Sequence, residues 1–192
     1  MKQIDSGYLE IILGPMFSGK TSKLIDVYKQ YQFCNIPVLV VNHADDNRYD
    51  KSQMTTHDGS KIDCEKWSTL SEFLNHHSVQ LMEDGPIAIL INEGQFFPDL
   101  YSNVKRLVNL YKAHVYVCGL DGDFKREKFG ELLDLIPLSD KVDKLTSLCV
   151  QCRDGTRAIF SHRITHETDQ KLIGSSESYI PLCRKCYTNN SK

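Results

Sequence analysis

A glycine-rich segment, GPMFSGKT at residues 14–21, fits the pattern G-x-x-x-x-G-K-[ST] of a phosphate-binding loop. Gly14 and Gly19 let the backbone curl so that its N–H groups point at a phosphate, and a following helix adds the positive end of its dipole. The Lys20 ammonium can reach the β- and γ-phosphates of a nucleoside triphosphate, and the Thr21 hydroxyl can bind Mg²⁺. An apolar stretch before the segment and a helical pattern after it distinguish a phosphate loop from a chance glycine-rich turn.

A second polar cluster follows the apolar stretch AILI at residues 88–91, where Asn92 and Glu93 stand next in the chain. Ligands of parallel α/β sheets bind outside the carboxyl ends of the strands, so we expect both side chains near the phosphate loop. A carboxylate there can take a proton from an acceptor hydroxyl or help to hold Mg²⁺ through water. The alternative is that Glu93 only caps a helix that starts near Pro98.

Four of the seven cysteines form two C-x-x-C pairs, Cys149 with Cys152 and Cys183 with Cys186. Four thiolates at such spacing can bind a structural Zn²⁺ in tetrahedral geometry. The chain between the pairs, residues 153–182, is then expected to be a long loop tethered at both ends. A chance pairing or a redox dithiol is the alternative. The odd total favours a reducing compartment over a disulfide framework.

The elements that must position these groups can be read from the apolar patterns. Short stretches rich in Val and Ile predict strands at residues 8–13, 36–41, 88–91 and 114–120. Apolar residues at helical spacing predict helices after Lys20 and after Pro98, and more weakly over 71–82. This alternation indicates an α/β fold, a parallel-sheet core that binds nucleotide through its phosphate loop. From about residue 145 the pattern changes, so we expect a core at 1–145 and a small zinc-bearing domain at 146–192.

Composition excludes several classes of protein. The 192 residues are 41% hydrophobic and 25% charged with a formal net charge of -2, as expected for a soluble globular protein. No apolar stretch approaches the roughly 20 residues of a membrane helix, and the start MKQIDSGYLE has no signal-peptide core. We therefore expect a cytoplasmic protein without a membrane partner. The basic cluster KREK at 125–128 leaves a zinc-bearing P-loop ATPase acting on nucleic acid as an alternative, which the overall charge argues against.

These motifs together resemble those of the zinc-bearing (type II) thymidine kinases found in animals, poxviruses and many bacteria. The resemblance runs from about Gly7 to Tyr187, and its motifs keep the family's order and spacing: GPMFSGKT, DNRY (46–49), EGQFFPD (93–99), GLDGDF (119–124), FG (129–130), KLTSLCVQC (144–152), FSHR (160–163), LIG (172–174) and CRKCY (183–187). It implies transfer of the γ-phosphoryl group of ATP to the 5′-hydroxyl of deoxythymidine, and also of deoxyuridine, in pyrimidine salvage and DNA precursor synthesis. It further implies a homotetramer, structural Zn²⁺, Mg²⁺ bound with ATP, feedback inhibition by dTTP, and no nucleic-acid partner.

The resemblance also assigns roles on the phosphate side of the site. Glu93 would be the catalytic base, with Lys20 and Arg48 stabilising charge on the transferring phosphoryl group. For Arg48 the alternative is a surface ion pair. Mg²⁺ would be held by Thr21 and Asn92. The implied ATP-binding residues are Gly14, Pro15, Met16, Phe17, Ser18, Gly19, Lys20, Thr21, Asp46, Asn47, Arg48, Asn92, Glu93, Gly94 and Gln95.

On the nucleoside side, the family's zinc-anchored loop closes over the substrate as a lasso whose backbone reads the edge of thymine. Phe124 would stack on the thymine ring, and Ser161 would line the space for its 5-methyl group. Without the resemblance, the apolar members of this set would be read as ordinary core. The implied contacts are Met16, Phe96, Leu120, Phe124, Phe129, Ser161, Gln170, Lys171, Leu172, Ile173, Gly174 and Tyr179.

The chain departs from the family pattern at Asn92, where the family has Asp before the base. An amide oxygen accepts hydrogen bonds from Mg²⁺-bound water without adding charge, and the amide nitrogen needs an acceptor of its own. Charge-assisted bonds are about twice as strong, so we expect a Mg²⁺ shell weaker by ~1–3 kcal/mol and an active enzyme. A catalytically impaired nucleotide-binding homologue is the alternative. Thr165, Gln170 and Ser175 are also unlike typical members.

Overall fold

A parallel sheet forms the centre of the molecule. The computed structural model describes residues 6–46, 52–56, 59–83, 87–172, 174 and 177–190. The sheet has six strands in the order β5-β2-β6-β7-β1-β8, and each neighbouring pair is parallel. Its strands are β1 (Tyr8–Leu13), β2 (Val38–His43), β5 (Glu65–Trp67), β6 (Ala88–Ile91), β7 (His114–Gly119) and β8 (Lys141–Lys144). The predicted α/β fold with a parallel sheet is confirmed.

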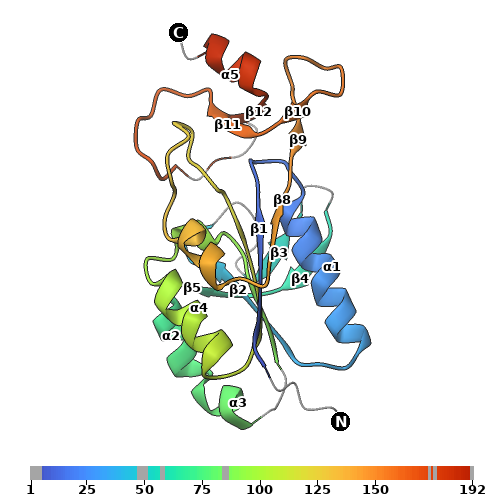
Figure 1. Ribbon diagram of the computed structural model, residues 1–192, viewed down its shortest axis with the longest axis vertical. Coiled ribbons are helices and arrows are strands. Elements are labelled where there is room, and N and C mark those ends of the chain that lie inside the picture. The colour runs from blue at the N-terminus through green and yellow to red at the C-terminus, as the bar shows by residue number, and fades with distance from the viewer. Residues whose placement is uncertain are drawn as a thin grey trace.

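Helices cover both faces of the sheet (Figure 1). One face carries α1 (Lys20–Phe33) together with the hairpin of β3 (Gln53–Thr55) and β4 (Lys61–Asp63). The other carries α2 (Leu70–His76), α3 (Ser78–Glu83), α4 (Leu100–Asn109) and the 3₁₀ helix η2 (Leu132–Leu138), and the short 3₁₀ turn η1 (Gly94–Phe96) follows β6.

The four central strands β1, β2, β6 and β7 each contribute to two apolar cores because successive side chains of a strand point to opposite faces. In β1, Ile11 packs into the cluster under α2 and α4, whereas Ile12 packs into the cluster under α1. Both side chains are fully buried. Burial on both faces explains why the sequences of these four strands are mostly apolar and show no polar–apolar alternation.

Some element boundaries differ from the prediction. The strand expected at 36–41 is β2 at Val38–His43, which starts after Pro37 and ends on two polar residues. Pro has no N–H to donate to a sheet, so a start after it is favoured. The weak helix expected at 71–82 is divided into α2 and α3 at His77. The strands β3, β4, β5 and β8 were not predicted.

The C-terminal part stands at one end of the molecule, opposite the N-terminal end (Figure 1). It consists of β9 (Ser147–Leu148) paired with β10 (Arg157–Ala158), β11 (Phe160–Arg163) paired with β12 (Tyr179–Leu182), and α5 (Arg184–Asn190). Its buried cluster is small: Cys149, Ala158, Leu182, Cys183 and Tyr187. Residues 164–178, named here the β11–β12 loop, connect its second pair of strands. Across the described part of the chain, no helix has the length and apolarity needed to cross a membrane.

Candidate active site and metal centre

A cavity of about 280 Å³ lies where β1, β2 and β6 end and the β11–β12 loop approaches them. It contains residues from both sides of the site expected from the sequence. The predicted residues that line it are Met16, Phe17, Ser18, Gly19, Lys20, Thr21, Asp46, Asn92, Glu93, Gln95, Phe96, Leu120, Phe129, Leu172, Gly174 and Tyr179. The phosphate loop, the carboxylate of Glu93 and the C-terminal loop therefore share one cavity.

The phosphate loop adopts a conformation that its glycines permit. Gly14 has φ 153°, and a Cβ at this position would approach the Leu145 carbonyl oxygen to 2.7 Å. Gly19 precedes α1 with φ 83°, in the left-handed region that favours glycine. Lys20 Nζ donates a hydrogen bond of 2.8 Å to the Pro15 carbonyl. The Ser18 hydroxyl oxygen is buried without a hydrogen-bond partner among the described residues. Such an orphaned donor beside the cavity fits a bound phosphate.

Glu93 is held in an uncommon backbone conformation at the end of β6. Its φ of 53° and ψ of 44° are left-handed, and non-glycine residues held in this region cluster at functional sites. Gln95 Nε2 donates a 2.6 Å hydrogen bond to the Glu93 carboxylate, and Gln95 Oε1 accepts a 3.0 Å bond from the Leu120 N–H. Gln95 thus orients the carboxylate. The helix-cap alternative is wrong, because the residue that precedes α4 is Asp99 and Glu93 lines the cavity.

Asn92 belongs to a buried chain of hydrogen bonds. Its Oδ1 accepts from the Cys118 thiol at 3.0 Å, and its Nδ2 donates to Asn42 Oδ1 at 3.2 Å. Asn42 Oδ1 also accepts from the His43 N–H at 3.0 Å, and Asn42 Nδ2 donates to the Asp46 carboxylate at 3.0 Å. The backbone N–H can only donate and the carboxylate accepts, so the orientation of the Asn42 amide is fixed. The amide nitrogen of Asn92 therefore has the acceptor that it requires.

The nucleoside side of the cavity combines core and loop residues. Phe96, Leu120 and Phe129 come from the core, and the rings of Phe96 and Phe129 meet edge to face at 5.5 Å. Leu172, Gly174 and Tyr179 come from the C-terminal part. This wall is apolar and aromatic, as a site for a planar base requires.

Ser161 and Phe124 lie near the cavity without lining it. The buried Ser161 hydroxyl accepts a 2.9 Å hydrogen bond from the Met16 N–H, so β11 is bonded to the phosphate loop. The Phe124 ring lies against Arg163, whose Cζ is 3.8 Å from the ring centroid. The contacts predicted for Ser161 and Phe124 with thymine stay predictions.

Two further loop residues connect the C-terminal part to the core. Gln170 Nε2 donates to the Asp123 carboxylate at 2.8 Å, and Lys171 forms an ion pair with Asp45 and lies 5.0 Å from the Phe96 ring centroid. This ion pair lowers the pKa of Asp45. Of the remaining predicted residues, Gly14, Pro15 and Gly94 do not line the cavity, whereas Asn47, Arg48 and Ile173 lie outside the described residues.

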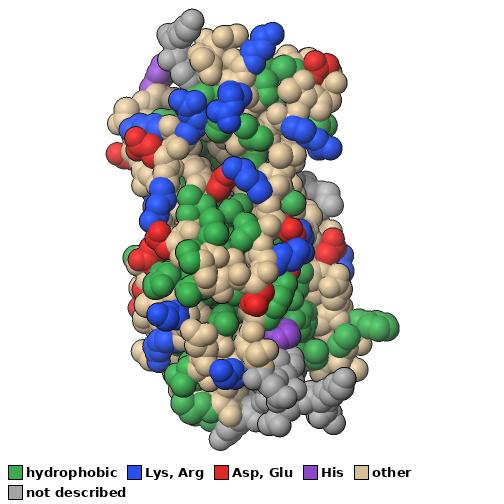
Figure 2. All heavy atoms as spheres, in the orientation of Figure 1, with side chains coloured by type: hydrophobic (Ala, Val, Ile, Leu, Met, Phe, Trp, Pro, Cys, Tyr) green, Lys and Arg blue, Asp and Glu red, His purple; other side chains and the backbone are tan. Residues whose placement is uncertain are grey.

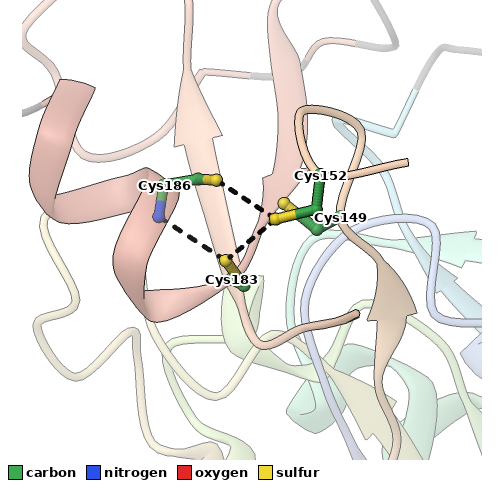
Figure 3. A group of neighbouring side chains, drawn as sticks. All are labelled: Cys149, Cys152, Cys183 and Cys186. Carbon is green, nitrogen blue, oxygen red and sulfur yellow. Dashed lines mark hydrogen bonds between the residues drawn. The ribbon is translucent and has the colours of Figure 1, made fainter. Parts of the chain in front are cut away.

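The four paired cysteines form a second centre. Their sulfur atoms all lie within 4.8 Å of one another. The side chains come from the turn after β9 and from the start of α5, and they point toward one another (Figure 3). Cys152 Sγ is 3.7 Å from Cys183 Sγ and 3.4 Å from Cys186 Sγ. This geometry and donor set fit one tetrahedral Zn²⁺.

The pKa values of two of these thiols are shifted in opposite directions. Burial alone would raise the pKa of Cys149, but the backbone N–H groups of Cys183, Cys152 and Gln151 lower it to about 6. Cys186 donates a hydrogen bond to the Cys152 sulfur, and this bond together with burial raises the pKa of Cys186 to about 12. Four adjacent thiols resist complete ionisation, and a bound cation removes that resistance.

Sequence reasoning missed six residues of the cavity wall: Ser22, Asn42, Gln53, Met54, Thr55 and Thr56. Asn42 had a usable signal, because it stands near the carboxyl end of a parallel strand, where ligands bind. The hairpin residues 53–56 had none, since a three-residue strand is too short to show a period.

Comparisons with known proteins agree with the site. The family model for thymidine kinase matches residues 7–187. The thymidine kinase of sheeppox virus (strain KS-1) is 41% identical over 184 residues, covering 96% of this chain and 98% of the relative. The thymidine kinase of Oryza sativa subsp. japonica is 40% identical over 182 residues, covering 94% and 66%. That of fowlpox virus (strain NVSL) is 38% identical over 190 residues, covering 97% and 100%.

Proposed function

The chain belongs to the thymidine kinase family and is a phosphotransferase, and we propose that it transfers the γ-phosphoryl group of ATP to the 5′-hydroxyl of deoxythymidine. Deoxyuridine is proposed as a second substrate. The product dTMP would serve pyrimidine salvage and DNA precursor synthesis. The family match gives no support to a nucleic-acid ATPase or to an impaired homologue. On the face shown in Figure 2, acidic and basic side chains are interspersed.

One observation carries the proposal. The phosphate loop, the oriented carboxylate of Glu93, and the apolar wall that includes Leu172 and Tyr179 all line the same cavity. A donor triphosphate on the loop and a nucleoside against the apolar wall would meet at Glu93. This arrangement supports in-line transfer between two bound substrates, in which positioning supplies much of the rate.

Glu93 is proposed as the base. Its carboxylate would accept the proton of the 5′-hydroxyl as that oxygen attacks the γ-phosphorus, and the bond from Gln95 holds it in place. Lys20 would bind the β- and γ-phosphates. Its Nζ keeps the bond to Pro15 within the loop, and an ammonium has three N–H donors in all. Arg48 is proposed as a further stabiliser of transferred charge on the basis of the resemblance alone.

Two metals belong to the proposal. Mg²⁺ bound with ATP supplies charge neutralisation on the phosphates, and Thr21 with Asn92 would hold it. The Asn92 oxygen keeps a second lone pair beside its bond to Cys118, so it can accept from a metal-bound water. Zn²⁺ at Cys149, Cys152, Cys183 and Cys186 is proposed as structural. It would hold together the two ends of the segment 153–182, which contains β11, β12 and the loop between them.

The remaining features are proposals that the family resemblance supports. They are a division into a core at 1–145 and a zinc-bearing domain at 146–192, a homotetramer, a cytoplasmic location, and feedback inhibition by dTTP. In that inhibition, the thymidine part of dTTP would bind against the apolar wall of the cavity, and its triphosphate would take the place of the donor phosphates.

A coupled assay of ADP release tests the proposed reaction. The protein is given ATP and Mg²⁺ with thymidine, with deoxycytidine, or with no nucleoside, and dTMP is identified by mass spectrometry. Thymidine-dependent turnover is the expected result. ADP release that ignores thymidine, or binding of both substrates without dTMP, would contradict the proposal.

A further inference from the structure

Arg163 stands at the root of the β11–β12 loop. It is the last residue of β11 and is paired across the strands with Tyr179, the first residue of β12. It is only 6% exposed. Tyr179 lines the cavity, as Leu172 and Gly174 do, whereas Arg163 does not. A buried cation next to the site but outside it requires an explanation, because an arginine is almost never buried without partners.

The donors of the Arg163 guanidinium bind carbonyls of the β11–β12 loop and the hydroxyl of Tyr179 in β12. Nε donates to the Tyr179 hydroxyl at 3.1 Å, and Nη2 donates to the same hydroxyl and to the Gln170 carbonyl at 3.2 Å. Nη1 donates to the carbonyls of Glu167 at 2.9 Å and Asp169 at 2.6 Å. A guanidinium has five N–H donors, and these bonds use one from Nε, two from Nη1 and two from Nη2.

Tyr179 extends this arrangement to the cavity. Its hydroxyl, which accepts from Arg163, donates to the Leu172 carbonyl at 2.9 Å. Three main-chain carbonyls between residues 167 and 170 are thus bound directly, and the carbonyl of Leu172 is bound through one hydroxyl. Bonds from a charged donor are about twice as strong as neutral ones, so these are the stronger bonds to the loop backbone.

Phe124 relates the loop to the core. Its ring lies beneath the guanidinium at 3.8 Å from Cζ, and its carbonyl accepts a hydrogen bond from the Tyr187 hydroxyl. A desolvated guanidinium over an aromatic face is attracted to the negative potential of the ring. Phe124 therefore holds Arg163 at a fixed place relative to the segment that follows β7.

We propose that Arg163 is a positioning residue for nucleoside recognition, which shapes the backbone of residues 167–172 and so places Leu172 and Tyr179 in the cavity. The nature of the nucleoside rests on the proposed function; the role of Arg163 in shaping the loop does not. Phe124 supports the guanidinium in this arrangement.

The test compares Arg163→Lys with Arg157→Lys, a matched control at an exposed position on β10. Lysine keeps the charge but has three donors and no planar fork, so it cannot bind the same set of oxygens. We expect the KM for thymidine to rise about 10–100-fold in Arg163→Lys, with the KM for ATP changed by less than about twofold. A role in general stability alone would change neither KM selectively. The control is expected to match the given protein.

A second readout needs no nucleoside. Trypsin cleavage after Lys171, followed by mass spectrometry, reports opening of the loop, and we expect faster cleavage in Arg163→Lys only. If circular dichroism shows that Arg163→Lys does not fold, Tyr179→Phe decides, because it keeps the ring and removes the hydroxyl that joins Arg163 to Leu172. Unchanged cleavage and thymidine KM in the folded variant would overturn the proposal. Absence of thymidine turnover in the given protein would overturn the proposed function, whereas faster cleavage would still support the role of Arg163.

Discussion

The substitution Asn92→Asp tests how the buried network of this chain is organised. In the structure, Asn92 Nδ2 donates to Asn42 Oδ1 at 3.2 Å. Asn42 cannot turn its amide to offer a donor without losing its bonds to the His43 N–H and to the Asp46 carboxylate. An aspartate at position 92 would therefore place a carboxylate oxygen against the Asn42 Oδ1 acceptor. A second carboxylate, that of Asp46, is bonded to the same Asn42 side chain.

The magnitude follows from the loss of one buried hydrogen bond. A buried polar group left without its partner costs about 1–3 kcal/mol. In a chain of this size each kcal/mol lowers the Tm by about 2–4 °C, so we expect the ligand-free variant to melt roughly 2–12 °C lower. Mg²⁺ with ATP would recover part of this loss, because a cation near the new carboxylate neutralises it. The ligand-induced rise in Tm is then larger in the variant than in the given protein.

Differential scanning fluorimetry with and without Mg²⁺ and a non-hydrolysable ATP analogue measures both effects. The exposed Asn109→Asp serves as a control for the same chemical change. In an Asn42→Ala background the opposing acceptor is gone, so Asn92→Asp should there have little effect on Tm. If Asn92→Asp does not lower the ligand-free Tm of the given protein, or lowers it as much in the Asn42→Ala background, this account of the network is refuted.

Three further predictions concern other parts of the site. Glu93→Gln should lower kcat by about 10²–10⁴-fold with little change in the KM for thymidine, since it removes the proposed base; steady-state turnover above a tenth of normal would contradict this. Ser161→Ala leaves the buried Met16 N–H without its acceptor and should reduce the free energy of unfolding by about 1–3 kcal/mol in urea titrations, an effect that an unchanged midpoint would exclude. Metal analysis should find one zinc per chain, and its removal by a chelator should lower the Tm and raise the KM for thymidine more than the KM for ATP. Equal effects on both KM values would argue against a role of the metal in holding the loop.

Local patterns predicted the parts of the fold that local sequence determines. The strands buried on both faces are apolar stretches, and the phosphate loop with α1 is specified by eight contiguous residues and a helical stripe. By contrast, β8 reads KVDK, because an edge strand beside α1 can carry charged side chains, and nothing in its sequence indicates a strand. The edge strand β5 and the hairpin of β3 and β4 are each too short to show a period.

Contacts between segments that are distant in the sequence could not be predicted from local patterns. The network around Asn92 joins the ends of β2, β6 and β7, so its partners follow only from the sheet order. Arg163 was part of a quoted motif, yet its role depends on carbonyl positions in a loop without regular structure. The resemblance to a family supplied the residues of the thymidine side, which their own types would have assigned to the core.

The bond between Ser161 and Met16 joins the segment that would hold the donor phosphates to the hairpin whose loop would enclose the nucleoside. If binding of one substrate moved either segment, this bond would change, and the binding free energies of the two proposed substrates would be coupled through it. Such coupling is symmetric at equilibrium: the factor by which ATP changes the affinity for thymidine equals the factor by which thymidine changes the affinity for ATP. One hydroxyl group would thus join the two halves of the cavity into a single thermodynamic unit.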